Sequence, residues 1–136
     1  MMVHEVSWIM ICIQNPEKLE SIVDYLFDDY HVVVTNNPEV KQQLHDMWME
    51  DVILLGHEDT YIPHNRRIRQ VIIIDDVVLS IIDTIERVKM SVQAPIMLIT
   101  KNKYYPFKFY ELMGIHYVMM TNYNQFPFLL RQRAYS

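Results

Sequence analysis

Short runs of consecutive apolar residues alternate along this chain with segments in which apolar residues recur every three or four positions. The runs have the length of β-strands and lie at residues 6–13, 31–35, 52–55, 71–74, 95–100 and 115–120. A run without polar alternation is typical of a strand that is covered on both faces. Because strand-like and helix-like segments follow one another with short loops, the pattern predicts parallel β-α-β units.

The helix-like segments carry start and stop signals. Asn15 and Asn37 are each followed by Pro and Glu, a sequence typical of a helix cap and first turn. Gly114 is expected to end a short helix over 106–113, and a last helix is expected over 124–133. The apolar stripes of the first three helices are predicted to be buried; they are Leu19, Ile22, Val23, Leu26 and Phe27, then Val40, Leu44, Met47 and Trp48, then Val77, Val78, Ile81, Ile82, Ile85 and Val88.

Two of the runs decide the layout of the predicted sheet. Residues 52–55 are predicted to form a buried central strand that ends at Gly56, where ligands usually bind in an open parallel sheet. Residues 71–74 are β-branched and favour a strand; a helix that begins near Arg67 is the alternative. The chain is therefore predicted to be one α/β domain over 1–136, a three-layer αβα sandwich. Its parallel sheet has five strands, or six if 71–74 is an inserted strand.

Charge and composition narrow the range of partners. The 136 residues carry a formal net charge of −5 and contain two glycines and one cysteine. A nucleic-acid face is not expected, because the one tight basic cluster, Arg66, Arg67 and Arg69, is interpreted as a solvated loop. No apolar run reaches the ~18 residues of a membrane span, and no secretory signal is recognised. We expect a cytoplasmic domain in which Cys12 is a buried structural thiol.

No cofactor is expected from the motifs. Neither of the glycine-rich phosphate-binding motifs occurs, and the serine elbow of hydrolases is absent. His57, Glu58, Asp59 and His64 lie close together and offer imidazole and carboxylate ligands, so a small metal-dependent enzyme is one alternative function. The spacing of the two histidines matches no established site, and an ordinary polar loop is the preferred interpretation. No metal site is therefore predicted.

The order of the elements resembles the receiver domain of two-component response regulators, a flavodoxin-like fold. Residues 51–56 look like the receiver strand that ends in the phosphoacceptor aspartate, and residues 95–100 look like the strand that ends in the switch Ser or Thr. Gly114 with Tyr117 and Val118 looks like the turn into the fifth strand. The likeness covers nearly the whole chain and implies a role in signalling or transcriptional control.

The chemistry of receivers is mostly missing at the matching positions. Gln14 and Asn15 stand where the resemblance implies an acidic pair for Mg²⁺, and amides bring no charge to hold a hard cation. Gly56 stands at the acceptor position and Thr121 at that of the lysine, so only Thr100 remains. The resemblance therefore implies a pseudo-receiver with a degenerate phosphoacceptor pocket. Such a module is not an enzyme, and it binds a protein partner or a second copy without phosphorylation.

A second register leaves another function open. If residues 71–74 form the third receiver strand, Asp75 or Asp76 becomes the phosphoacceptor of an active receiver. The simpler interpretation of these two residues is a helix cap and a favourable first-turn charge.

Aromatic residues are concentrated in the last third of the chain. Their offsets in the short helix at 106–113 point around it, so one stripe cannot bury them all. Exposed aromatics would form a hydrophobic interaction surface on the face through which receivers dimerise. We predict a homodimer or a protein partner at this patch, with the interface residues Tyr105, Phe107, Tyr110, Tyr117 and Phe126.

Overall fold

The computed structural model describes residues 6–120, in which strands and helices alternate. The strands are β1 Ser7–Ile13, β2 His31–Thr35, β3 Val52–Leu54, β4 Arg67–Ile74, β5 Ile96–Thr100 and β6 Tyr117–Met120. The helices are α1 Pro16–Leu19, the 3₁₀ turn η1 Glu20–Ile22, α2 Val23–Leu26, α3 Pro38–Asp46, α4 Val78–Ser91 and α5 Phe107–Leu112. Thr121, Phe126 and the helix expected over 124–133 lie outside the described residues.

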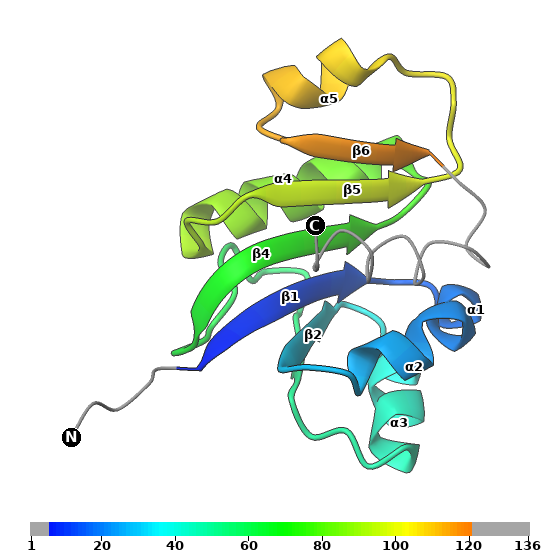
Figure 1. The fold of residues 1–136 in the computed structure, drawn as a ribbon, viewed down its shortest axis with the longest axis vertical. Coiled ribbons are helices and arrows are strands. Elements are labelled where there is room, and N and C mark those ends of the chain that lie inside the picture. Colours follow the sequence, from blue (N-terminus) through cyan, green and yellow to red (C-terminus); the bar gives the residue numbers. More distant parts are fainter. Residues whose placement is uncertain (1–5, 121–136) are drawn as a thin grey trace.

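The six strands form one parallel sheet in the order β3-β2-β1-β4-β5-β6. Figure 1 shows the arrowheads of the labelled strands pointing the same way, so their carboxyl ends lie along one edge. The chain runs outward from β1 to β3, returns to the centre with β4, and runs outward again to β6. The α/β sandwich is thereby confirmed with six strands. Strands β2-β1-β4-β5-β6 have the flavodoxin-like order, and β3 is added at one side.

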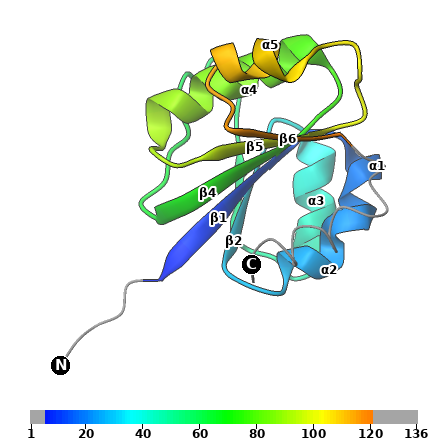
Figure 2. The same cartoon turned by 45° about the horizontal axis from the view of Figure 1, so that its top comes forward.

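Helices cover both faces of the sheet. Figure 2 shows α1, α2 and α3 on one face and α4 and α5 on the other. Side chains of β1 alternate between the two: Ile9, Ile11 and Ile13 pack in the core under α1–α3, whereas Met10 and Cys12 pack in the core under α4 and α5. Burial on both faces explains why the central strands are continuous apolar runs instead of alternating patterns.

The prediction of a buried central strand at 52–55 is wrong. β3 has three residues, pairs with β2 in the described sheet, and leaves Leu54 39% exposed. The central place beside β1 belongs to β4, whose residues Val71–Ile74 are all buried. From that position Val71 and Ile73 pack in the core under α4 and α5, and Ile72 and Ile74 pack in the core under α1–α3. Residues 71–74 are accordingly a strand, and the helix alternative is excluded.

Three residues of the predicted apolar stripes lie elsewhere. The first helix is broken by the 3₁₀ turn, so Leu19, Ile22 and Leu26 are buried as predicted while Phe27 is 54% exposed. Helix α3 ends at Asp46, which leaves Trp48 outside the helix and 91% exposed. Val77 precedes the first turn of α4 and is 62% exposed.

Candidate functional site

The carboxyl edge of the sheet has its centre between β1 and β4, where the order of the strands reverses. In open α/β sheets, the crevice at such a reversal is the usual place for ligands. Gln14 follows β1, and Asp75 and Asp76 follow β4 at this edge. In nucleotide-binding sheets of this type, the turn after the first strand is a glycine-rich loop that contacts the phosphates. Here the turn after β1 contains Pro16 instead. Asn15 caps α1 by accepting a 2.9 Å hydrogen bond from the Glu17 amide.

The first half of the sheet ends in a closed polar network. Gln14 Oε1 accepts hydrogen bonds from the Thr35 hydroxyl at 3.3 Å and the Asn36 amide at 2.6 Å. Thr35 Oγ1 in turn accepts from the Asn37 amide at 3.1 Å, and Asn37 Nδ2 donates to the Gln14 carbonyl at 3.0 Å. Asn37 Oδ1 caps α3 through the Glu39 amide at 2.9 Å. We call Gln14, Thr35, Asn36 and Asn37 the first polar network.

The second half repeats this arrangement bond for bond. Asp76 Oδ1 accepts from the Thr100 hydroxyl at 3.2 Å and the Lys101 amide at 2.7 Å. Thr100 Oγ1 accepts from the Asn102 amide at 3.0 Å, and Asn102 Nδ2 donates to the Asp76 carbonyl at 3.1 Å. Asn102 Oδ1 accepts from the Tyr104 amide at 2.9 Å. Asp76, Thr100, Lys101 and Asn102 form the second polar network.

The two networks show that β1-β2-β3 and β4-β5-β6 are structural repeats. The sequence signal is a Thr-x-Asn that follows an apolar strand, at Thr35–Asn37 and again at Thr100–Asn102. Each copy alone has the composition of an ordinary loop, so the repeat was not predicted from the sequence. The repeats differ in charge: the acceptor is the amide Gln14 in the first and the carboxylate Asp76 in the second. Because an amide oxygen suffices as acceptor in the first network, the negative charge of Asp76 is available for a further role.

That role includes an ion pair across the reversal. Lys18 Nζ lies 2.9 Å from Asp76 Oδ2, with side-chain exposures of 11% and 31%. Both carboxylate oxygens of Asp76 are therefore occupied, one by the second polar network and one by Lys18. An acceptor for a phosphoryl group would have to give up these contacts first. Asp76 is also among the residues that line a shallow cavity of about 490 Å³, together with Lys101, Asn102, Lys103 and Tyr104.

Asp75 has a different environment from its neighbour. It is 7% exposed and directly follows Ile74, which pairs with Ile13 of β1 and Ile99 of β5. Its Oδ1 accepts from the Val77 amide at 3.0 Å, while its buried Oδ2 has no hydrogen-bond partner among residues 6–120. The cap of α4 is Val77, so neither aspartate is the helix cap that the sequence suggested. Asp75 therefore stands at the end of the central strand with one unused acceptor.

Gly56 does not belong to this edge site, which corrects the predicted pocket. It follows β3, and strands β2 and β1 lie between it and β4. Its amide donates to Asp59 Oδ2 at 2.6 Å in a local turn. Of the predicted pocket, the described residues Gln14, Asn15 and Thr100 do lie at the carboxyl ends of β1 and β5, and the residues that follow β4 between them are Asp75 and Asp76.

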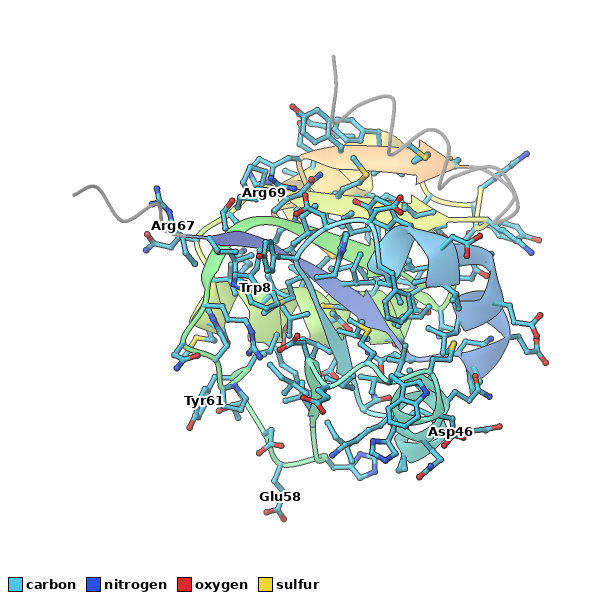
Figure 3. All side chains as sticks on the ribbon, turned by 60° about the horizontal axis from the view of Figure 1, so that its bottom comes forward. Trp8, Asp46, Glu58, Tyr61, Arg67 and Arg69 are labelled. Atoms are coloured by element: carbon cyan, nitrogen blue, oxygen red, sulfur yellow. The ribbon has the colours of Figure 1, made fainter. Side chains whose placement is uncertain are left out.

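The loop after β3 does not assemble a metal site. Figure 3 shows Glu58 at the outer tip of the loop, directed away from the body of the molecule. His64 is turned toward α4, with Nε2 3.1 Å from the Ser91 carbonyl oxygen and Nδ1 accepting from the Arg66 amide at 3.2 Å. Across residues 6–120, no three His, Cys, Asp or Glu side chains are grouped as metal ligands. His57 and Asp59 instead line a cavity of about 540 Å³ whose wall on α4 carries both acidic and basic side chains.

The predicted aromatic interface is partly core. Tyr110 is fully buried, which removes it from the exposed patch. It packs with Phe109 at a ring-centroid distance of 5.4 Å, and Tyr105 stacks on Phe109 at 4.7 Å. Burial is the main cause that raises the pKa of the Tyr110 phenol, followed by its proximity to Tyr105 and Asp76. Phe107 and Tyr117 are exposed by 42% and 45%.

No protein-family model, curated protein or solved structure matches this chain. The receiver resemblance consequently stays a prediction, to be judged by the strand order and the groups at the carboxyl edge. In the part of the chain that the structure describes, the helices are all too short or too polar to cross a bilayer.

Proposed function

We propose that this chain is a receiver-like regulatory module that works by protein–protein contact and without phosphorylation. The observation that carries the proposal is the state of Asp76. Its Oδ1 receives two hydrogen bonds and its Oδ2 is paired with Lys18, so the nearest match to an acceptor carboxylate is already neutralised.

The groups around Asp76 support the same conclusion. Phosphotransfer from a small donor to a carboxylate needs a divalent cation, and hard cations need several oxygen ligands with negative charge. The end of β1 supplies the amides Gln14 and Asn15, whose side chains are engaged in the first polar network and the α1 cap. Lys18 adds a positive charge where the cation would be needed.

A second candidate is an active receiver whose acceptor is Asp75. The observation in its favour is Oδ2 of Asp75 at the end of the central strand β4, which has no hydrogen-bond partner in the part of the chain that the structure describes. Against it stand the burial of that side chain and the lack of a second carboxylate at the end of β1. This candidate predicts a covalent phosphoryl adduct that Asp75→Asn abolishes.

The two candidates differ in one measurement. The chain is incubated with acetyl phosphate and Mg²⁺, and its intact mass is recorded beside Asp75→Asn and Asp76→Asn. We expect no phosphoryl adduct on any of the three proteins. An adduct on the unmodified chain that disappears with Asp75→Asn would replace the proposal by the second candidate. An adduct that disappears with Asp76→Asn would also contradict the proposal, because Lys18 would then have to release Asp76.

We propose a second copy of the chain as the partner at the face formed by α5 and β6. Phe107 and Leu112 of α5 are 42% and 78% exposed, and Met120 of β6 is 38% exposed. Leu112→Glu tests this face, and Leu79→Glu on α4 is the matched control because Leu79 is 79% exposed. Light scattering over a concentration series should show a dimer that Leu112→Glu dissociates and Leu79→Glu leaves intact. A monomer at all concentrations would exclude this partner.

A further inference from the structure

Trp48 combines an unfavourable backbone conformation with full exposure. Its φ is 67°, in the left-handed region that bulky L-residues rarely adopt, and its side chain is 91% exposed. An exposed indole in this conformation gains no burial that would offset the backbone strain. Something other than the stability of the described fold must therefore favour tryptophan at this position.

The turn that holds Trp48 is a helix C-terminal motif that normally takes glycine. The Trp48 amide donates to the His45 carbonyl at 3.0 Å, and the Met49 amide donates to the Leu44 carbonyl at 3.0 Å. These are the paired bonds of a Schellman motif, in which the left-handed residue is usually Gly. The geometry of the turn thus requires no side chain at Trp48.

The second structural repeat contains the same turn with the expected residue. After α5, the Gly114 amide donates to Glu111 at 3.0 Å and the Ile115 amide to Tyr110 at 3.1 Å. Gly114 has φ 106°. Helices α3 and α5 hold equivalent places in the two repeats, since each follows a polar network and precedes an edge strand. Trp48 therefore stands where the molecule's own second copy of the turn uses glycine.

The surroundings of Trp48 indicate the chemistry of a partner. Asp46 and Glu50, two positions before and after it, are both exposed. Figure 3 shows Asp46 at the periphery of the molecule, at the opposite end from Arg67. An exposed indole two positions from exposed carboxylates offers a guanidinium a ring to stack on and an acid for a hydrogen bond.

The other tryptophan shows this combination inside the fold. Arg66 Cζ lies 5.0 Å from the centroid of the Trp8 ring, and Arg66 Nη2 lies 2.9 Å from Asp51 Oδ1. Trp48 has the aromatic ring and the acidic neighbours. Within the described residues no cation is placed over it.

We propose that Trp48, with Asp46 and Glu50, docks an arginine that a protein partner presents. The surface lies next to β3, at the opposite side of the sheet from α5 and β6. The Trp48 surface is thus separate from the proposed dimer face, and each of the two proposals can be tested without the other.

The test uses the full chain and a displayed library of random peptides as the probe. Enriched peptides are synthesised and titrated by isothermal calorimetry, with Trp48→Gly, Trp48→Phe and Glu50→Gln as variants. We expect the enriched peptides to share an arginine. Trp48→Gly should weaken their binding by about tenfold or more, Glu50→Gln by about threefold, and Trp48→Phe less than Trp48→Gly because it keeps an aromatic face.

Thermal melting separates docking from a structural role. Trp48→Gly should raise the melting temperature by about 3 °C, because glycine relieves the left-handed strain. A lower melting temperature would show that Trp48 is needed for the fold and would overturn the inference. The inference would also be overturned if the enriched peptides lacked a basic residue, or if they bound Trp48→Gly as tightly as the unmodified chain. A dimer that Trp48→Gly dissociates would assign the surface to a second copy, and the arginine partner would be rejected.

Discussion

Lys18 and Asp76 join the two structural repeats through an ion pair, with Nζ and Oδ2 2.9 Å apart. Lys18 belongs to α1 of the first repeat and Asp76 follows β4 of the second. The pair therefore crosses the reversal of strand order, where folds of this kind usually keep an open crevice. In the first repeat the equivalent acceptor is the uncharged Gln14, which has no need of such a partner.

The Lys18–Asp76 pair should show energetic coupling. Asp76→Asn keeps an oxygen for Thr100 and Lys101 but loses the charge facing Lys18, so we expect the free energy of unfolding to fall by about 1–2 kcal/mol, less than for a fully buried pair because Asp76 is near one-third exposed. Lys18→Met should cost about 1 kcal/mol or less, because two hydrogen bonds to Asp76 remain. Urea unfolding of the double variant should cost less than the sum of the two. Strict additivity would mean that the contact is not formed in solution.

The two polar networks should both be weakened by the same substitution. Thr35 and Thr100 are both fully buried, and each hydroxyl donates one hydrogen bond and accepts another. Thr35→Val and Thr100→Val should each lower the free energy of unfolding by about 1–3 kcal/mol, since an acceptor and a donor lose their partner. Thr→Ser variants, which keep the hydroxyl, serve as controls in the same urea titrations. A neutral effect at one site only would show that the repeats are not equivalent.

Local signals in the sequence predict most of the elements. Asn15 and Asn37 cap the helices that their Pro-Glu sequences suggested, and residues 31–35 form β2 with the predicted bounds. These features depend on neighbours in the chain, so their chemistry is visible in the sequence. Gly114 likewise ends α5 with a positive φ, as its position predicted.

Long-range arrangement is what the sequence does not reveal. Residues 52–55 and 71–74 are both four-residue apolar runs. Their local sequences do not distinguish which of them pairs with β1, and in the structure it is β4 and not β3. That choice moved the candidate site from Gly56 to Asp75 and Asp76. Trp48 continued an apolar stripe in the sequence, but the Schellman motif ended α3 before it. The sequence predicts Tyr110 at a surface, whereas its ring packs against Tyr105 and Phe109. Helical periodicity does not reveal these contacts between side chains.

Cys12 should be unreactive while the protein is folded. It lies in β1 and is 1% exposed, and burial raises the pKa of its thiol to about 12 from 9.0. The folded state therefore keeps the proton that the unfolded chain releases, so the resulting stability is present below pH 9.0 and is lost as pH rises toward 12. Labelling with a thiol reagent at pH 8 should be slow and should accelerate in step with urea unfolding. Rapid labelling without denaturant would place the thiol at the surface.

Gly114 should tolerate no side chain. Its φ of 106° is unfavourable for other residues, and a Cβ there would lie 3.3 Å from Lys89 Nζ. Gly114→Ala should lower the free energy of unfolding by about 1–2 kcal/mol, mainly through the backbone. Lys89→Ala is the control, because it removes the three atoms nearest to the new methyl group. If Lys89→Ala restores the stability of Gly114→Ala, the cost is steric and the turn itself is not strained.

Tyr110 should be replaceable by phenylalanine but not by alanine. Its ring is fully buried against Tyr105 and Phe109, whereas its hydroxyl has no hydrogen-bond partner among the described residues. Tyr110→Phe should leave the free energy of unfolding unchanged or raise it by up to about 1 kcal/mol, while Tyr110→Ala should lower it by about 3–5 kcal/mol. Because burial raises the pKa of the phenol above 10.0, its contribution to stability is lost as pH increases beyond that value. Tyr110→Phe should therefore also flatten the alkaline fall in stability measured by urea titration. If Tyr110→Ala stays fully stable, Tyr110 is at the surface, as the sequence predicted, and not in the core.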